Sequence, residues 1–257
     1  MEVLINLGRR AKRSLREAKA IVLRRLGWLK GDWRSALSEE TRFWETALRQ
    51  QGRYWLPEEY QQRTDPDSEL QDYLKALLPL PPNSRVRILD VGAGPLTSLG
   101  KRWEGRQVEI VAIDPLAAEY KLLLEKLAIR PPVPTTFGHG ERLLEQFEEN
   151  EFDLAYASNA LDHSQDPLAA IEQMIAVVKP LRYVYLWHFA NEGIAEAYGG
   201  LHQWNFQIQK GDFLIDDGRR ALSLTKEFNG IADLACETQT AFGKKVVTAK
   251  LKKLGLR

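Results

Sequence analysis

The chain has 257 residues, of which 44% are apolar, so it can bury a sizeable core and is not disordered as a whole. A single cysteine, Cys236, excludes an internal disulfide framework and favours a reducing, cytoplasmic compartment. We recognise no signal peptide and no run of 18 apolar residues, so we expect no transmembrane helix. The formal net charge is +1, which does not indicate a nucleic-acid partner for the body of the chain.

Charge is concentrated at the start of the chain. Residues 1–34 contain ten basic and three acidic residues, a net charge of +7, so the remainder carries −6. Helical spacing puts apolar residues on one face of this segment and most basic ones on the other: Leu4, Leu7, Ala11, Leu15, Ala18, Val22, Leu26 and Leu29. We expect a basic amphipathic helix that packs on its own domain, lies on an anionic membrane surface or enters a groove of a partner protein.

Residues 35–82 are predicted to form a helical extension or lid, rich in polar and aromatic residues and ended by Pro79, Pro81 and Pro82. The main domain is expected over residues 83–257.

Strand and helix patterns alternate from Val86 onward. Apolar runs typical of strands buried on both faces cover 86–91, 108–113, 133–137, 152–157 and 183–187. Helical patterns lie between them, at 97–104, 117–128, 140–148 and 166–178. This alternation predicts an α/β fold with a doubly wound, mostly parallel sheet, which two late strands at 221–225 and 244–251 complete as a seven-stranded sheet.

The first predicted strand leads into the turn Gly92-Ala93-Gly94, which we expect to open a helix. Glycines allow a tight turn and a close approach of the backbone to a ligand. An acid, Asp90, precedes the turn, and a second acid, Asp114, ends the next strand twenty residues after Gly94. A carboxylate at that position can accept hydrogen bonds from both hydroxyls of a ribose, although as a lone residue it would more simply cap a helix.

These stretches resemble the motifs of class I (Rossmann-like) S-adenosylmethionine (SAM)-dependent methyltransferases. Residues 90–94 resemble the first motif, 112–116 the second and 138–143 the third, while 152–163 with Asp166-Pro167 resemble the fourth strand and its loop. Pro95 and Leu96 replace a frequent third glycine, and His139 replaces a common acid. The resemblance implies SAM as the cofactor and a cofactor site made of Asp90, Gly92, Ala93, Gly94, Asp114, Pro115, Leu116, Gly140, Glu141, Ser158 and Asn159.

The resemblance also implies roles for these residues. Asp90 would orient the turn or bind the methionine amino group, and residues 92–94 would pass beneath the methionine. Asp114 would hold the ribose, Leu116 would cover the adenine, and Glu141 would supply the contact to the adenine.

Three of the four histidines follow strands of the predicted sheet at one edge, and the fourth lies just beyond. Because ligands of open α/β sheets bind at the carboxyl ends of the strands, we expect a catalytic base here, in the order His202, His188, His163. An insertion at about residues 188–220 mixes aromatic and polar groups and is predicted to form the acceptor pocket, with these residues binding the acceptor: Asn191, Glu192, Tyr198, Gln203, Trp204 and Asn205. A buried cap helix would also explain this segment.

A metal-assisted mechanism is an alternative. Asn159, Asp162, His163 and a later histidine resemble the carboxylate-and-histidine spacing of the metal-dependent branch of the superfamily, but Asn159 stands where that branch has a glutamate, which weakens this alternative. A divalent metal ion, with Asp162 and His163 as ligands, therefore remains the second choice of cofactor beside SAM alone. The sequence predicts methylation of a hydroxyl group on a saccharide, a glycolipid or another polyhydroxyl small molecule. A methyltransferase of a membrane-borne quinone precursor, placed on the inner face of a membrane, and a non-catalytic SAM-binding module remain alternatives.

Overall fold

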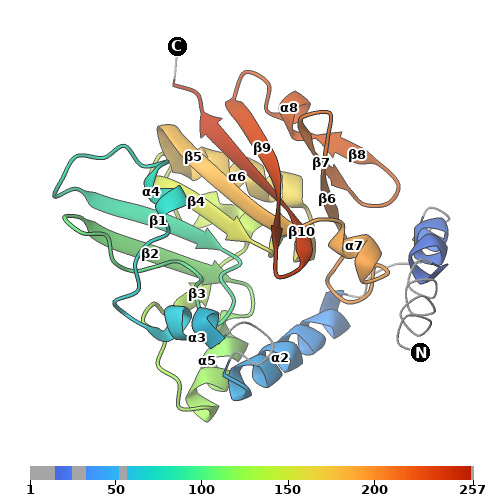
Figure 1. Ribbon diagram of the computed structural model, residues 1–257, viewed down its shortest axis with the longest axis horizontal. Coiled ribbons are helices and arrows are strands. Elements are labelled where there is room, and N and C mark those ends of the chain that lie inside the picture. Colours follow the sequence, from blue (N-terminus) through green and yellow to red (C-terminus); the bar gives the residue numbers. More distant parts are fainter. Residues whose placement is uncertain (1–14, 25–32, 52–56, 256–257) are drawn as a thin grey trace.

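The computed structural model describes residues 15–24, 33–51 and 57–255. Its centre is a seven-stranded sheet in the order β3-β2-β1-β4-β5-β10-β9 (Figure 1). Five strands are parallel: β1 (Arg85–Val91), β2 (Gln107–Asp114), β3 (Thr135–Phe137), β4 (Phe152–Ser158) and β5 (Val178–Phe189). Two antiparallel strands extend it: β9 (Ala232–Ala241) and β10 (Lys244–Lys253). The predicted α/β fold with a mostly parallel sheet is confirmed.

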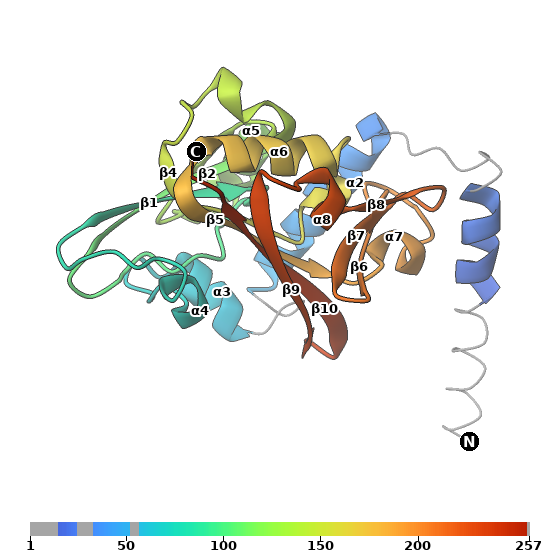
Figure 2. The same ribbon diagram turned by 90° about the horizontal axis from the view of Figure 1, so that it is seen from above.

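Each face of the sheet is apolar and covered, which explains the uninterrupted apolar runs in the sequence. Seen from above, α5 (Ala117–Lys126) and α6 (Pro167–Val177) lie on one face, and α3 (Pro57–Thr64) and α4 (Asp72–Lys75) lie on the other (Figure 2). Leu89 and Val91 of β1 pack towards α6, whereas Val86 and Ile88 join the leucines around α4. The extension before the domain therefore supplies part of the core.

The prediction of a helix over 97–104 is wrong, because residues 92–104 follow β1 as an irregular segment. Residues 62–71 of the N-terminal extension form hydrogen bonds with the backbone groups of this segment instead. Gln62 and Gln71 donate side-chain hydrogen bonds to the Ser98 carbonyl at 2.9 and 2.7 Å, and the Lys101 amide donates to the Ser68 carbonyl at 2.7 Å. Partners that lie about thirty residues earlier in the chain replace the bonds of a helical turn.

The strand predicted at 221–225 does not belong to the main sheet. β8 (Ala221–Ser223) pairs with β7 (Asp212–Asp216) in a separate three-stranded sheet that begins with β6 (Asn205–Gln209). The main sheet ends on β9, a largely exposed edge strand joined to β10 by a two-residue turn in which Phe242 and Gly243 both have positive φ. Its polar composition hid this strand from the search for apolar runs.

The other helical segments are short or lie at the edge of the main sheet. The segment predicted as a helix over 140–148 is a 3₁₀ helix, η1 (Gly140–Glu145). Residues 15–24 of the basic segment are helical, and α2 (Trp33–Arg49) crosses the carboxyl edge of the parallel strands (Figure 1). A short helix, α7 (Glu192–Ala195), follows β5, and α8 (Leu224–Glu227) follows β8.

We predict that Gly100→Ala destabilises the protein by about 1–3 kcal/mol, the usual cost of overpacking. A β-carbon at this position would overlap the backbone of Glu69 and Leu70, which cannot move without losing the contacts of the extension. Urea denaturation measures the change. Gly255→Ala is the control, since its β-carbon would lie 3.8 Å from the Leu181 side chain. Equal stability of the two variants would contradict the packing described above.

Candidate active site

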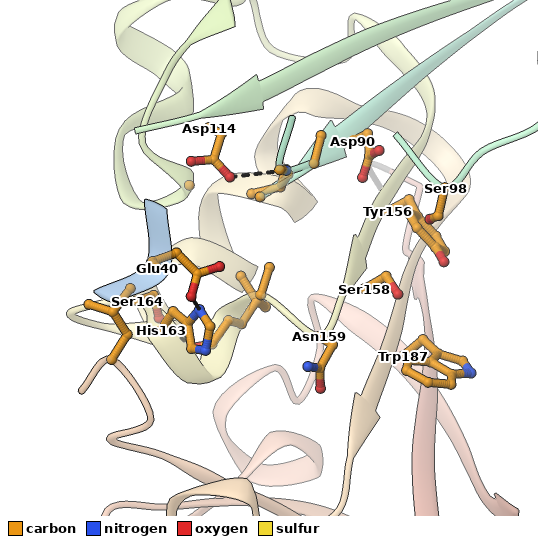
Figure 3. A pocket seen from close by; sticks show the side chains of 18 of the residues that line it. Glu40, Asp90, Ser98, Asp114, Tyr156, Ser158, Asn159, His163, Ser164 and Trp187 are labelled. Carbon is orange, nitrogen blue, oxygen red and sulfur yellow. Dashed lines mark hydrogen bonds and ion pairs between the residues drawn. The ribbon is translucent and has the colours of Figure 1, made fainter. Parts of the chain in front are cut away.

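A cavity of about 1300 Å³ opens at the carboxyl ends of β1, β2, β4 and β5, with α2 along one side. Figure 3 shows side chains from β1, β2, β4, β5 and α2 around it. Its wall includes each of the cofactor residues expected from the motifs: Asp90, Gly92, Ala93, Gly94, Asp114, Pro115, Leu116, Gly140, Glu141, Ser158 and Asn159. The structure thus brings these residues together on one surface.

The turn after β1 requires its glycines. Gly92 and Gly94 have φ values of 71° and 64°, a region that L-residues rarely adopt. A β-carbon on Gly92 would overlap the Ala160 side chain, and one on Gly94 would lie 2.7 Å from the Trp44 ring. The backbone of residues 92–94 therefore lines the cavity, and Ala160 and Trp44 leave no room for a β-carbon at either glycine.

Asp90 stands below this turn and is buried. The Thr97 hydroxyl donates a 2.5 Å hydrogen bond to its carboxylate. Burial raises the pKa of Asp90 to about 6, although the Thr97 hydrogen bond works in the opposite direction. The carboxylate thus keeps a hydrogen-bonded position at the floor of the cavity.

Asp114 links the glycine turn to β2. The Gly94 amide donates to one carboxylate oxygen at 3.1 Å (Figure 3). The Leu116 amide donates to the other oxygen at 2.9 Å. Burial raises the pKa of Asp114 to about 7 and outweighs these two hydrogen bonds. Since each carboxylate oxygen accepts two bonds, both oxygens retain an acceptor position for a ligand.

Two of the predicted histidines meet on the cavity wall. His163 lies in the 3₁₀ turn η2 (Leu161–His163) after β4, and its Nε2 is 3.0 Å from Nδ1 of His202. His202 Nδ1 is 2.8 Å from Asp162 Oδ2, and Asp162 is 1% exposed. Burial would raise the pKa of Asp162, but the two imidazoles hold it well below its usual range.

The same contact shifts the pKa of His202. Burial lowers it, but the hydrogen bond and charge of Asp162 outweigh burial and raise the pKa of His202 to about 9. Without another ligand, His202 is therefore a protonated partner of Asp162 at neutral pH and not a free base.

Residues 60–217 match the family described as the methyltransferase domain. The chain belongs to this family. This membership confirms the prediction that the chain is a SAM-dependent methyltransferase, with SAM as its methyl donor. No curated protein matches the sequence.

Solved methyltransferases have similar structures at low sequence identity. One from Aquifex aeolicus is 13% identical, with a TM-score of 0.46, over 82% of this chain and 98% of its own. The 1,6-didemethyltoxoflavin-N1-methyltransferase of Burkholderia thailandensis, with that compound and S-adenosylhomocysteine bound, is 14% identical, with a TM-score of 0.45, over 85% and 90%. The CurJ carbon methyltransferase is 14% identical, with a TM-score of 0.48, over 71% of this chain; the match spans only 52% of its length.

The methyltransferase places His188, expected as a catalytic residue, away from the cavity. Side chains alternate along β5, so that Trp187 and Phe189 line the cavity while His188 points to the opposite face. There it is 1% exposed with its ring 4.4 Å from that of Phe206, and burial lowers its pKa to about 4. This position does not suit a base that must reach an acceptor.

Among the predicted acceptor residues, only Glu192 lines the cavity. The others are absent from its wall, and most hold the insertion together: Asn191, Tyr198, Gln203, Trp204 and Asn205. For example, the Asn205 side chain accepts from the Ile194 amide at 2.8 Å and donates to the Tyr198 hydroxyl at 3.0 Å. The density of polar groups in this segment reflects its own internal bonding.

Several residues of the cavity wall were not predicted. Glu40 and Trp44 reach it from α2, where the Trp44 indole donates to Glu40 at 2.7 Å. Tyr156, Trp187 and Phe189 come from β4 and β5. The alternation that places Tyr156 and Ser158 on one face was a usable signal, whereas nothing in the local sequence shows that α2 crosses the cavity.

We predict that the free energy of unfolding of the wild type, relative to that of the Asp114→Asn variant, falls as pH rises from about 4 to about 7. The folded-state pKa is raised above the unfolded value, so the folded protein holds the extra proton, and stability is lost as that proton leaves. The slope is at most roughly 1.4 kcal/mol per pH unit. Urea unfolding of both ligand-free proteins across this range measures it, and a difference that grows with pH would be contrary to the buried carboxyl described.

Proposed function

We propose that this methyltransferase methylates a hydroxyl group of a saccharide or another polyhydroxyl small molecule. The observation that carries the proposal is the Asp162–His163–His202 cluster on the wall of the cavity that also contains the SAM motifs. An alcohol is a poor nucleophile until its proton is removed, and a site for a more reactive nitrogen or carbon acceptor has less need of such a cluster.

The cofactor half of the cavity suits SAM. The positive φ values of Gly92 and Gly94 bring the backbone up to the cavity without β-carbons, and Asp114 retains acceptor positions for two ribose hydroxyls. Asp90, Gly140 and Glu141 complete this half. SAM, when bound, supplies a methyl group whose carbon bonds to the acceptor oxygen as its bond to sulfur breaks, leaving S-adenosylhomocysteine.

The acceptor half, beside β4 and β5, combines aromatic faces with charged groups. Trp187, Phe189 and Phe242 contact one another edge to face, and the Lys244 ammonium lies 4.6 Å from the centre of the Phe189 ring. Lys244 also pairs with Glu192 at 3.2 Å. Rings for stacking next to charged hydrogen-bonding groups support a polyhydroxyl acceptor.

We place the proton transfer at the cluster, with His163 as the group nearest to the acceptor. Both histidines line the cavity, with side chains 19% and 27% exposed, but His202 is bonded to Asp162 at 2.8 Å, so we assign the proton transfer to His163. The pair of Asp162 and His202 fixes the imidazole from behind. In this proposal His163 takes the role of base that the sequence suggested for His202 and His188.

The function is tested with methyl-labelled SAM and a panel of glycosides, catechols, quinols and primary amines. We expect label in O-methyl ethers, identified by NMR. His163→Gln should lower turnover about 10²–10⁴-fold, the usual contribution of a general base, and leave the affinity for S-adenosylhomocysteine nearly unchanged. Asp114→Ala should instead weaken the binding of S-adenosylhomocysteine, by roughly 1.5–3 kcal/mol.

Label that appears only in amines would refute hydroxyl methylation. Label confined to quinols would favour the membrane-borne acceptor, and tight S-adenosylhomocysteine binding without any transfer would favour a binding module. Full turnover of His163→Gln would remove the cluster from the mechanism.

We further propose that, within the extension of residues 35–82, α2 acts as the lid, because it lines the cavity while residues 70–78 belong to the core. We also propose that the basic helix attaches the enzyme to an anionic membrane surface. In the described part of this helix, Leu15 and Val22 of the predicted apolar stripe are 73% and 55% exposed. Arg24, on the other side, donates to the Asp217 carbonyl at 3.0 Å and to Gln203 at 2.9 Å, and lies over the Tyr198 ring. Leu4, Leu7, Ala11, Leu26 and Leu29 lie outside the described residues. Within the described ranges, no helix is both long and apolar enough to span a membrane.

We predict that the full chain sediments with vesicles containing phosphatidylserine and that salt weakens this binding by screening. The double variant Leu15→Gln, Val22→Gln should bind several-fold less well. Leu122→Gln, which changes a 67% exposed leucine of α5, is the matched control. Equal sedimentation of all three proteins would exclude the apolar face of this helix as the contact.

A further inference from the structure

We propose that Asp162, His163 and His202 form a binding site for one divalent transition-metal ion, such as Zn²⁺. Asp162 Oδ2, His163 Nε2 and His202 Nδ1 form a small triangle whose edges are 2.8, 3.0 and 3.4 Å. Two imidazoles and one carboxylate are ligands that such ions prefer.

The size of the triangle matches a coordination sphere. Ligand atoms about 2.0–2.2 Å from a zinc ion are roughly 2.9–3.4 Å apart in octahedral or tetrahedral geometry. Three convergent atoms at these separations form one face of such a polyhedron, and the remaining positions are left for other oxygen ligands.

Hydrogen bonds alone leave one of the three contacts weak or unfavourable. A ring nitrogen has either one proton or one lone pair in its plane. If His202 Nδ1 donates to Asp162, it can share that proton with His163 Nε2 at 3.0 Å only in a weaker three-centre bond. If it accepts from His163, it faces the Asp162 carboxylate at 2.8 Å with a lone pair. A cation among the three atoms makes every contact favourable.

The groups behind the ligands are those that support a metal site. Glu40 Oε2 lies 3.9 Å from Nδ1 of His163, on the side of the ring away from the proposed ion (Figure 3). The charges of Glu192 and Glu196 raise the pKa of His202 and so favour positive charge at this place. Carboxylates in such positions orient metal-bound imidazoles and increase their basicity.

A further observation comes from the second oxygen of Asp162. Its Oδ1 is buried and has no hydrogen-bond partner in the part of the chain that the structure describes. An unpartnered buried oxygen is costly, and bidentate coordination would satisfy it.

The role of the ion rests on the proposed function, whereas the site itself does not. With an ion bound, the His163 imidazole would be a ligand and would no longer take the proton itself. The ion would instead bind the acceptor oxygen and favour its deprotonated form, and the proton would pass to solvent.

The test measures metal binding in the absence of acceptor. The full chain is stripped with EDTA, dialysed, and titrated with Co²⁺, followed by its visible absorption, and with Zn²⁺ by calorimetry. We expect one ion per chain, and His163→Gln and His202→Gln should each weaken binding at least about tenfold. His139→Gln, a cavity histidine outside the cluster, should bind like the wild type.

S-adenosylhomocysteine affinity of each variant serves as the folding control, because the proposed cofactor residues do not include the three ligands of the cluster. Absence of stoichiometric binding to the wild type, or binding by both cluster variants as tight as that of the wild type, would overturn the metal site. Metal binding without transfer to any hydroxyl would leave the site standing and refute the proposed function.

Discussion

The hydrogen bond from the Gly94 amide to the Asp114 carboxylate joins the turn after β1 to the end of β2. Both ends of this bond depend on burial and backbone conformation. Gly94 adopts a positive φ, and Asp114 is buried, which raises its pKa to about 7. The floor of the cofactor half is built on this connection, and the Thr135 hydroxyl adds a 2.7 Å bond to the Gly94 carbonyl.

The extension before the domain changes how this floor is supported. The backbone of residues 96–102 is bonded to side chains and carbonyls of residues 62–71, and the leucines in and around α4 pack against β1 and β4. α2 then brings Trp44 over Gly94 and Glu40 beside His163. One segment therefore contributes to the core, to the cofactor half and to the surroundings of the histidine cluster.

The histidine cluster combines a buried carboxylate with an imidazole that is partly exposed to the cavity. Asp162 is fully buried and its charge is stabilised by imidazoles, while His163 remains partly exposed to the cavity. A metal ion at this site would displace the proton that His202 shares with Asp162, so occupancy of the site and the protonation of His202 are linked. Metal content and pH therefore have to be controlled together in any assay of the enzyme.

The sequence by itself determined the parallel sheet and which residues gather around the glycine turn at its carboxyl edge. Apolar runs bounded by glycines and acids are local patterns, and the carboxyl ends of neighbouring parallel strands necessarily lie at one edge. Only the tertiary structure decided which histidines meet. His163 and His202 are 39 residues apart, and their contact depends on the path of the insertion after β5, whereas His188 is turned away by the alternation of a single strand. The missing helix after β1 has the same cause: its backbone bonds are made by residues distant in the chain, and no local pattern records such partners.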